Sequence, residues 1–366
     1  MIDIPLVDLR AQHEQVADEV AEGWAEVLKT TAFIGGRQVG AFEAEFAAYQ
    51  GVPHCVGVAN GTDAIELALR ALGVGVGDEV VLPANTFIAT AEAVARAGAT
   101  PVLVDCVADT GLIDVTRIAD ALTERTKAIV PVHLYGQAAP IEQIRAVVGD
   151  LPIVEDAAQA QGARRFDVPV GGLGEIAATS FYPGKNLGAY GDGGGVLTKS
   201  DELAAAVRLL REHGSPRKYE HSVLGFNSRL DTLQAVVLSA KLRRLEGWNT
   251  ARRAAAARYH ELLSGVDGVM LPVTLEGNLP VWHLYVVRVA ERDRVLAALH
   301  EAGVGAGIHY PTPVHLTGAF ESLGHKVGDF PVAEAVAGEI VSLPLFAEIT
   351  PAQQDRVAAA LAEAVR

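Results

Sequence analysis

Cysteine is scarce in this sequence. Only Cys55 and Cys106 occur in 366 residues, and they form no Cys-x-x-Cys pair. Each lies in or at the end of an apolar run, which predicts buried thiols rather than disulfides or zinc ligands. This cysteine usage is typical of a protein from a reducing compartment.

Basic residues and long apolar runs are also few. The chain has 30 Lys and Arg against 45 Asp and Glu, a net charge of −15. A general nucleic-acid binder needs a basic face, so we expect no nucleic-acid partner. No apolar run approaches the length of a membrane span, and Met1 to Pro5 lack the features of a signal peptide. We therefore expect a cytoplasmic protein without membrane contact.

Two kinds of ligand site are missing from the sequence. The glycine-rich segments do not follow a strand and open a helix, as a dinucleotide fingerprint requires, and there is no Gly-Lys-Ser or Gly-Lys-Thr loop. The histidines show no metal-ligand spacing, so we expect no metal site and interpret them as structural by default: His133, His283, His309 and His315.

The chain does contain a regular alternation of strand-like and helical segments after two N-terminal helical patterns at 12–28 and 39–49. Strand patterns at 54–59, 79–82, 101–104, 127–134 and 152–154 alternate with helical patterns at 62–72, 87–97, 118–122 and 141–148. This predicts an α/β fold with a mostly parallel sheet between helices. Ligands bind beyond the carboxyl ends of the strands in such sheets, so we expect the chemistry in those loops.

The pattern changes after Ser200. Helical segments at 202–212, 230–245 and 251–263 are followed by a smaller set of strands and helices, at 281–289, 292–302, 304–309 and 351–365. We expect a large domain over 1–247 and a smaller C-terminal α/β domain over 248–366.

One lysine stands on a turn at the end of a strand-like run. The run 177–182 ends at Pro183-Gly184, and Lys185 follows directly. Burial favours the neutral form of an amine, and a neutral lysine amine is a nucleophile that can form a Schiff base. The alternative is a surface turn with a solvated lysine.

Two further segments are candidates for ligand contacts. Gly61-Thr62-Asp63 lies where a strand passes into a helix, and the N–H groups of a helix start favour an anion; the alternative is capping by Thr62 or Asp63 without a ligand. Asp156 follows a buried run with Glu155 beside it, and alternation along a strand turns these two carboxylates to opposite faces. Gln159 follows at a spacing that could place it on the same side as Asp156. The alternative is that Asp156 only caps the turn that follows the strand.

Taken together, these segments resemble the nucleotide-sugar aminotransferases of the DegT/DnrJ/StrS family, which are fold-type I pyridoxal-phosphate enzymes. The resemblance spans essentially the whole chain. Its blocks are Asn60–Ala64, Asn85–Thr90, Glu155–Ala160, Ser180–Gly188, Gly225–Asp231, His309–Pro311 and Pro313–Leu316. It implies a large domain with a seven-stranded type of mixed sheet and a smaller C-terminal domain.

The resemblance also implies a role for individual residues. Lys185 would carry pyridoxal 5'-phosphate covalently and Asp156 would pair with its ring nitrogen. The remaining cofactor contacts would be Gln159 at the ring hydroxyl, Phe87 on the ring face, and Gly61, Thr62, Asp63 and Ser180 at the phosphate. Asn227 would reach the phosphate of the neighbouring subunit, which implies a homodimer with shared active sites.

The branch of the family follows from the lysine block. Related sugar dehydratases have His where this chain has Lys185, so the resemblance implies transamination, with L-glutamate as donor. The block looks most like enzymes that aminate a dTDP-linked 3-keto-6-deoxyhexose; the alternatives are a 4-keto sugar aminotransferase and a non-catalytic regulatory protein. Candidate contacts to a diphosphate are the basic cluster Arg211, Arg217 and Lys218 with Tyr219, for which the alternative is a solvated loop. Candidate contacts to the sugar are His309, Tyr310 and His315.

Overall fold

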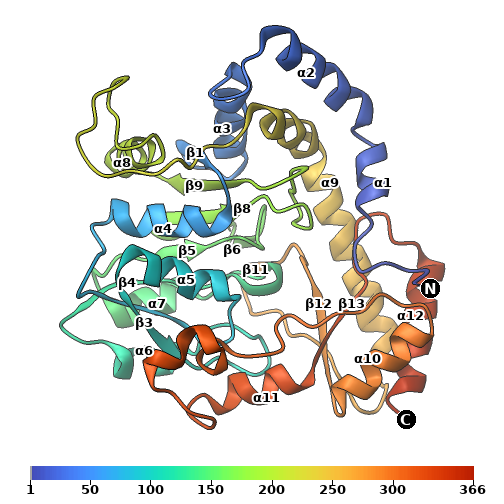
Figure 1. Ribbon diagram of the computed structural model, residues 1–366. Coiled ribbons are helices and arrows are strands. Elements are labelled where there is room, and N and C mark those ends of the chain that lie inside the picture. The colour runs from blue at the N-terminus through green and yellow to red at the C-terminus, as the bar shows by residue number, and fades with distance from the viewer. Residues whose placement is uncertain (1) are drawn as a thin grey trace.

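The structure of the protein is a computed structural model, and it describes residues 2–366 (Figure 1). Its helices are α1 (Leu9–Glu14), α2 (Ala17–Thr30), α3 (Arg37–Tyr49), α4 (Gly61–Ala71), α5 (Ile88–Ala97), α6 (Val115–Ala121), α7 (Ile141–Val148), α8 (Asp201–Arg211), α9 (Thr232–Leu263), α10 (Arg292–Glu301), α11 (Pro331–Glu339) and α12 (Pro351–Ala364). Three 3-10 turns lie at Leu134–Gly136, Val314–Leu316 and Gly318–Leu323.

The main sheet is built from two hydrogen-bonded groups of strands. One has the order β1 (His54–Val58), β9 (Gly194–Thr198), β8 (Ile176–Ser180), β5 (Val154–Asp156), and the other β3 (Thr100–Val104), β2 (Glu79–Pro83), β4 (Thr126–Ile129). Parallel bridges Ile129–Ile153 and Val132–Asp156 join the groups between β4 and β5. β9 pairs antiparallel with both its neighbours, whereas the other pairings are parallel. The predicted mostly parallel mixed α/β sheet is confirmed.

Helices cover both faces of this sheet because alternate residues of its strands point to opposite sides. Along β8, Ile176 and Ala178 pack into the apolar cluster that includes α4, α5 and α8, whereas Ala177 packs into the cluster formed with α3 and α9. Figure 1 shows α4 and α5 on one side of the strands and α9 passing on the other. The strands are nearly all-apolar, as expected when both faces are covered.

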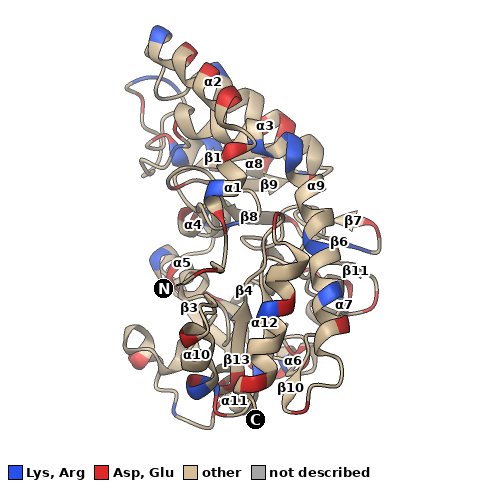
Figure 2. Cartoon of the chain, turned by 90° about the vertical axis from the view of Figure 1, so that its right-hand side faces the viewer, with Lys and Arg blue, Asp and Glu red and all other residues tan. Residues whose placement is uncertain are grey.

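The C-terminal part carries a second, antiparallel sheet of order β10 (Val269–Met270), β12 (Tyr285–Val289), β13 (Ile340–Leu343), packed with α10 and α12. A third small sheet joins β11 (Asn278–Leu279), β6 (Arg164–Arg165) and β7 (Val168–Pro169). Acidic residues predominate along α2 and basic residues along α9 (Figure 2). No helix within residues 2–366 is long and apolar enough to cross a membrane.

Four sequence-based element predictions are wrong. The segments 230–245 and 251–263 belong to one continuous helix, α9, although Gly247 interrupts the pattern. A helical glycine costs only about 1 kcal/mol relative to alanine, and the adjacent buried Trp248 and Asn249 offset this through packing. The domain boundary that we expect at 247/248 therefore lies inside a helix, and this division stays a prediction.

The other three concern where elements begin and end. The helix expected over 12–28 is divided into α1 and α2, because Gln15 at the break binds the C-terminal part through Trp248 and Glu348. The strand expected over 127–134 ends at Ile129, since Pro131 has no N–H to donate. The strand expected over 304–309 is reduced to single bridges at Val304 and Gly307.

Candidate active site

The carboxyl ends of β1, β5 and β8 point to the same edge of the sheet, and a cavity of about 810 Å³ opens there. Its volume suits a ligand of cofactor-plus-substrate size. Nine of the predicted site residues line it: Gly61, Thr62, Phe87, Asp156, Gln159, Ser180, Lys185, His309 and Tyr310. The structure thus brings together residues that are far apart in the sequence.

Lys185 lies in the turn after β8, as the sequence predicts. Its backbone N–H donates to the carbonyl of Tyr182 at 2.9 Å, which closes the turn around Pro183-Gly184. Burial lowers the pKa of the Lys185 amine to about 8, and the negative charge of Asp156 opposes that shift. The Lys185 side chain lines the cavity, which excludes the solvated surface turn, and the lowered pKa favours its neutral form relative to an exposed lysine.

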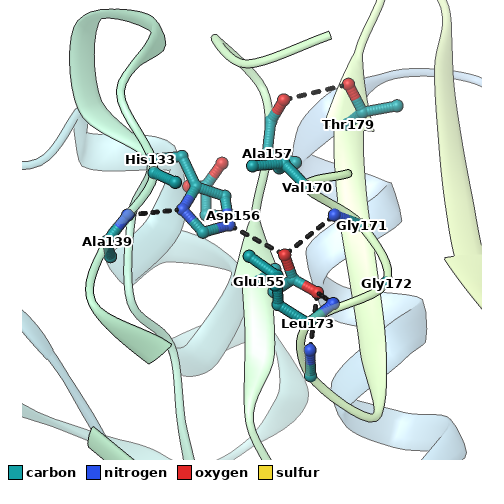
Figure 3. Close-up of polar contacts among 12 residues, drawn as sticks. His133, Ala139, Glu155, Asp156, Ala157, Val170, Gly171, Gly172, Leu173 and Thr179 are labelled. Atoms are coloured by element: carbon teal, nitrogen blue, oxygen red, sulfur yellow. Dashed lines mark hydrogen bonds and ion pairs between the residues drawn. The ribbon is translucent and has the colours of Figure 1, made fainter. Parts of the chain in front are cut away.

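Glu155 and Asp156 point to opposite faces of β5, as alternation requires. Glu155 is enclosed on the far side, where it accepts hydrogen bonds from His133 Nε2 at 2.9 Å and from the backbone N–H groups of Gly171, Leu173 and Gly174 (Figure 3). Burial raises the pKa of Glu155, but these hydrogen bonds and the charge of His133 outweigh burial and hold it below its usual value. The ionised carboxylate thus anchors the strand beneath the site.

Asp156 faces the cavity. Its Oδ2 accepts a hydrogen bond from the Thr90 hydroxyl at 2.7 Å, and its Oδ1 accepts one from the N–H of Ala158 at 3.2 Å. Burial raises the pKa of Asp156 above its ordinary value, although Thr90, Ala158 and the charge of Lys185 act in the other direction. A cationic group next to this carboxylate would restore its charge.

The start of α4 contacts the end of β8 closely. A Cβ atom on Gly61 would lie 2.6 Å from the Cβ of Ser180, so only glycine allows this approach. Asn60 is the helix cap, because its side chain accepts from the N–H of Asp63 at 2.8 Å; capping by Thr62 or Asp63 is not observed. The first N–H groups of α4 and the Ser180 hydroxyl can therefore face an anion.

Asp63 does not oppose such an anion. Its carboxylate is directed to Arg96 at 3.2 Å and accepts a hydrogen bond from the Ser228 hydroxyl at 2.8 Å, and it does not line the cavity. The negative charge at the helix start is thus paired with Arg96.

An aromatic wall closes one side of the cavity. The rings of Phe87 and Tyr310 lie 5.0 Å apart, and Phe87 keeps 49% of its surface exposed. The Tyr310 hydroxyl accepts a hydrogen bond from Gln159 Nε2 at 3.0 Å, and Gln159 Oε1 accepts one from the N–H of Tyr135 at 2.6 Å. Gln159 is therefore fixed between two tyrosines, and Phe87 presents an open ring face to a ligand.

Several predicted contact residues lie away from the cavity of this chain. Arg217, Lys218 and Tyr219 are exposed in the segment between α8 and α9, and Asn227 is exposed at its end. His315 is buried and pairs with Glu334 at 3.0 Å. These residues, like Asp63, are not among those that line the cavity.

Residues that we did not predict complete the site. Thr90 orients Asp156, Asn60 caps α4, and Arg96 and His283 also line the cavity. Thr90 lies within the block Asn85–Thr90 that carries the family resemblance, so a signal was present for it. For His283 the sequence carries no local signal, because its partners come from other parts of the chain.

Comparisons with known proteins point to one family. A family model described as the DegT/DnrJ/EryC1/StrS aminotransferase family matches residues 14–362. The dTDP-3-amino-3,4,6-trideoxy-alpha-D-glucose transaminase of Streptomyces venezuelae is 45% identical over 98% of this chain and 96% of the relative. A protein of Geobacillus stearothermophilus named "Pleiotropic regulatory protein" is 47% identical over 100% of this chain and 99% of its own length.

Solved structures give the same result. The crystal structure of DesV from S. venezuelae with a ketimine intermediate superposes with a TM-score of 0.97 at 44% identity, covering 100% of both chains. Family model, relatives and fold therefore confirm the resemblance read from the sequence. This chain belongs to the DegT/DnrJ/EryC1/StrS aminotransferase family.

Proposed function

We propose that this chain is a pyridoxal-phosphate-dependent enzyme that transfers the amino group of L-glutamate to a nucleotide-linked keto sugar. The substrate we propose is a dTDP-linked 3-keto-6-deoxyhexose, which becomes the 3-amino sugar. The observation that carries the proposal is a lysine whose amine pKa is lowered to about 8, in one cavity with the buried carboxylate of Asp156. Relatives over 40% identical are named as dTDP-3-amino sugar transaminases, which supports the choice of the 3-position.

The cavity residues suit pyridoxal phosphate group by group. The helix start at Gly61 and Thr62, with the Ser180 hydroxyl, would hold the phosphate, since a Cβ on Gly61 would fill the gap to Ser180. The open face of Phe87 would lie on the ring, and Gln159 would donate to the ring hydroxyl. Asp156 would pair with the ring nitrogen, and Lys185 would supply the amine for attachment.

The residues then have distinct chemical tasks. When bound, pyridoxal phosphate supplies an electron-withdrawing ring that stabilises negative charge on the carbon next to the substrate nitrogen. Asp156, oriented by Thr90, would pair with a protonated ring nitrogen, because that positive charge would favour the ionised form of this buried carboxylate. The Nζ of Lys185 would take a proton from that carbon and hold it on the amine, since an amine whose pKa is lowered to about 8 can accept and release a proton near neutral pH.

A turnover assay tests this proposal. Loaded enzyme, L-glutamate and either a 3-keto or a 4-keto sugar nucleotide are incubated, 2-oxoglutarate release is measured, and the position of the new amine is determined by NMR. We expect amination at C3 and no turnover by Lys185→Ala. Amination at C4 alone would replace the proposed substrate by the 4-keto sugar.

The name of the G. stearothermophilus relative makes a regulatory protein the second candidate. A purely regulatory protein would release no 2-oxoglutarate with any keto sugar, even when loaded with the cofactor. The same assay therefore separates the two functions.

A further inference from the structure

A chain of buried amides leads from the backbone to a histidine of the cavity. Asn249 Nδ2, on α9, donates to the carbonyl of Gln161 at 2.9 Å. Asn186, directly after Lys185, donates through Nδ2 to Asn249 Oδ1 and to the carbonyl of Val281, both at 2.9 Å. Asn186 Oδ1 lies 3.2 Å from Nδ1 of His283. Asn186 and Asn249 are 1% and 0% exposed, so water does not compete for these groups.

The two backbone carbonyls fix the direction of every hydrogen bond in this chain. A carbonyl oxygen only accepts, so the atoms that face Gln161 and Val281 must be amide nitrogens. The oxygen of Asn186 is then the atom that faces His283, and Nδ1 of that ring must carry the hydrogen. In a neutral imidazole the other nitrogen, Nε2, then has a free lone pair.

The surroundings of His283 keep the ring neutral and leave Nε2 available. Burial, followed by the charges of Lys185, Arg252 and His309, holds the pKa of His283 well below its usual value. Within residues 2–366 no hydrogen bond reaches Nε2, yet Nε2 is not among the fully enclosed polar atoms without a partner. Because His283 lines the cavity, this lone pair is accessible from the cavity.

We propose that His283 is a substrate-binding residue whose Nε2 accepts a hydrogen bond from a hydroxyl group of the keto sugar. A carboxylate of the amino donor has only acceptor atoms and would be repelled by this lone pair. The amino group of L-glutamate is the group that is transferred, so it is not free to donate a lasting hydrogen bond to His283. A sugar hydroxyl is the donor group that remains free throughout the reaction, so His283 distinguishes sugars that carry this hydroxyl from sugars that lack it.

The inference rests on the proposed function, and its first test does not depend on activity. In nitrogen-15 NMR of histidine-labelled holoenzyme at pH 7, one ring should be neutral with its hydrogen on Nδ1. Its signal should be lost in His283→Asn, because that variant has no imidazole at this position. A charged ring, or a neutral ring with the hydrogen on Nε2, would contradict the proposal.

The second test compares two substitutions. His283→Asn places an amide where Nδ1 was, so it can still donate to Asn186 but has no acceptor at the Nε2 position. His283→Gln places an amide oxygen near the Nε2 position. We expect the KM for the keto sugar to rise at least 10-fold in His283→Asn and to be partly restored in His283→Gln. The single-turnover rate with L-glutamate alone should fall by a smaller factor than the sugar reaction in both variants.

The exposed His300→Asn is the matched control and should leave both KM values unchanged. Equal loss of the glutamate and sugar reactions in His283→Asn would show a merely structural role and overturn the inference. If the wild-type enzyme aminates no sugar nucleotide, the proposed function fails and the sugar contact fails with it, whereas the NMR result still decides the protonation state of the ring.

Discussion

Burial sets the chemistry of single residues in this protein, and Lys185 is the clearest case. Burial lowers the pKa of its amine from the ordinary 10.5 to about 8. Each pKa unit is a factor of ten, so at pH 7 the neutral fraction of Lys185 is about 300 times that of an exposed lysine. The attachment of pyridoxal phosphate requires the neutral amine.

We therefore predict the pH dependence of cofactor attachment. The second-order rate of pyridoxal-phosphate binding to apo-protein, followed by absorbance, should rise with pH and level off above about pH 8. Lys185→Ala should give no borohydride-trapped adduct, whereas Lys199→Ala should trap it normally. If the rate still rises tenfold per pH unit beyond pH 9, the pKa of the Lys185 amine is not lowered.

A second buried amine, Lys241, makes a prediction about stability. Its Nζ donates to Gln12 Oε1 at 2.8 Å and to the carbonyl of Gly188 at 2.7 Å, lies 4.6 Å from the centre of the Tyr190 ring, and has no carboxylate partner among the ion pairs of residues 2–366. Burial lowers its pKa to about 8. Between about pH 8 and pH 10.5 the unfolded chain binds a proton here that the folded chain does not, so stability rises with pH in this window.

The size of this rise is at most about 3 kcal/mol, from 2.5 pKa units at 1.36 kcal/mol each. Lys241→Met should remove it, so the difference in unfolding free energy between wild type and variant should change in that window. Urea unfolding at pH 7.5 and pH 10 measures this change. A difference that is the same at both pH values would mean that Lys241 has an ordinary pKa.

At the scale of elements, the position of the site depends on how β5 is held. Glu155 accepts four hydrogen bonds, and His133, which donates one of them, also accepts at Nδ1 from the N–H of Ala139 (Figure 3). Glu155→Gln replaces an acceptor oxygen by an NH2 group that faces backbone donors. We expect the free energy of unfolding to fall by about 3 kcal/mol, as when one partner of a buried ion pair is removed.

Thermal or urea unfolding measures that loss. The control is Glu246→Gln, whose carboxylate is 61% exposed and pairs with Arg253, and which should cost less than about 1 kcal/mol. Because the pKa of Glu155 is lowered in the fold, its contribution is present above about pH 4.5 and is lost as the pH falls further. A Glu155→Gln variant as stable as the control at pH 7 would contradict this role.

The helices and strands also show which features of the fold the sequence can predict and which it cannot. The strands and α4 were predictable because their apolar runs end at Gly, Pro or Asn, and these signals are local. The continuity of α9 through Gly247 depends on the packing of Trp248 and Asn249, which no local pattern contains. Lys185 and Asp156 stand at strand ends, where chemistry is expected, whereas His283 acquires its role from Asn186 and Asn249, far away in the sequence.

At the scale of the whole molecule, some residues implied by the resemblance lie outside the cavity of their own chain. The segment between α8 and α9, with Arg217, Lys218 and Tyr219, extends away from the sheet (Figure 1), and Asn227 is exposed. A homodimer with shared active sites accounts for this arrangement, because these residues would then serve the cavity of the partner. This assembly is a prediction that mixed dimers can test.

The test combines Lys185→Ala with Asn227→Asp, which brings a negative charge toward the phosphate. Each variant alone should be nearly inactive. If Asn227 serves the partner's cavity, a mixed dimer has one site with both defects and one site with none, so mixing should restore activity, up to about a quarter of the wild-type level after random exchange. If Asn227 served its own cavity, every site would keep one defect and mixing would restore nothing, because no site would then combine an intact Lys185 with an intact Asn227.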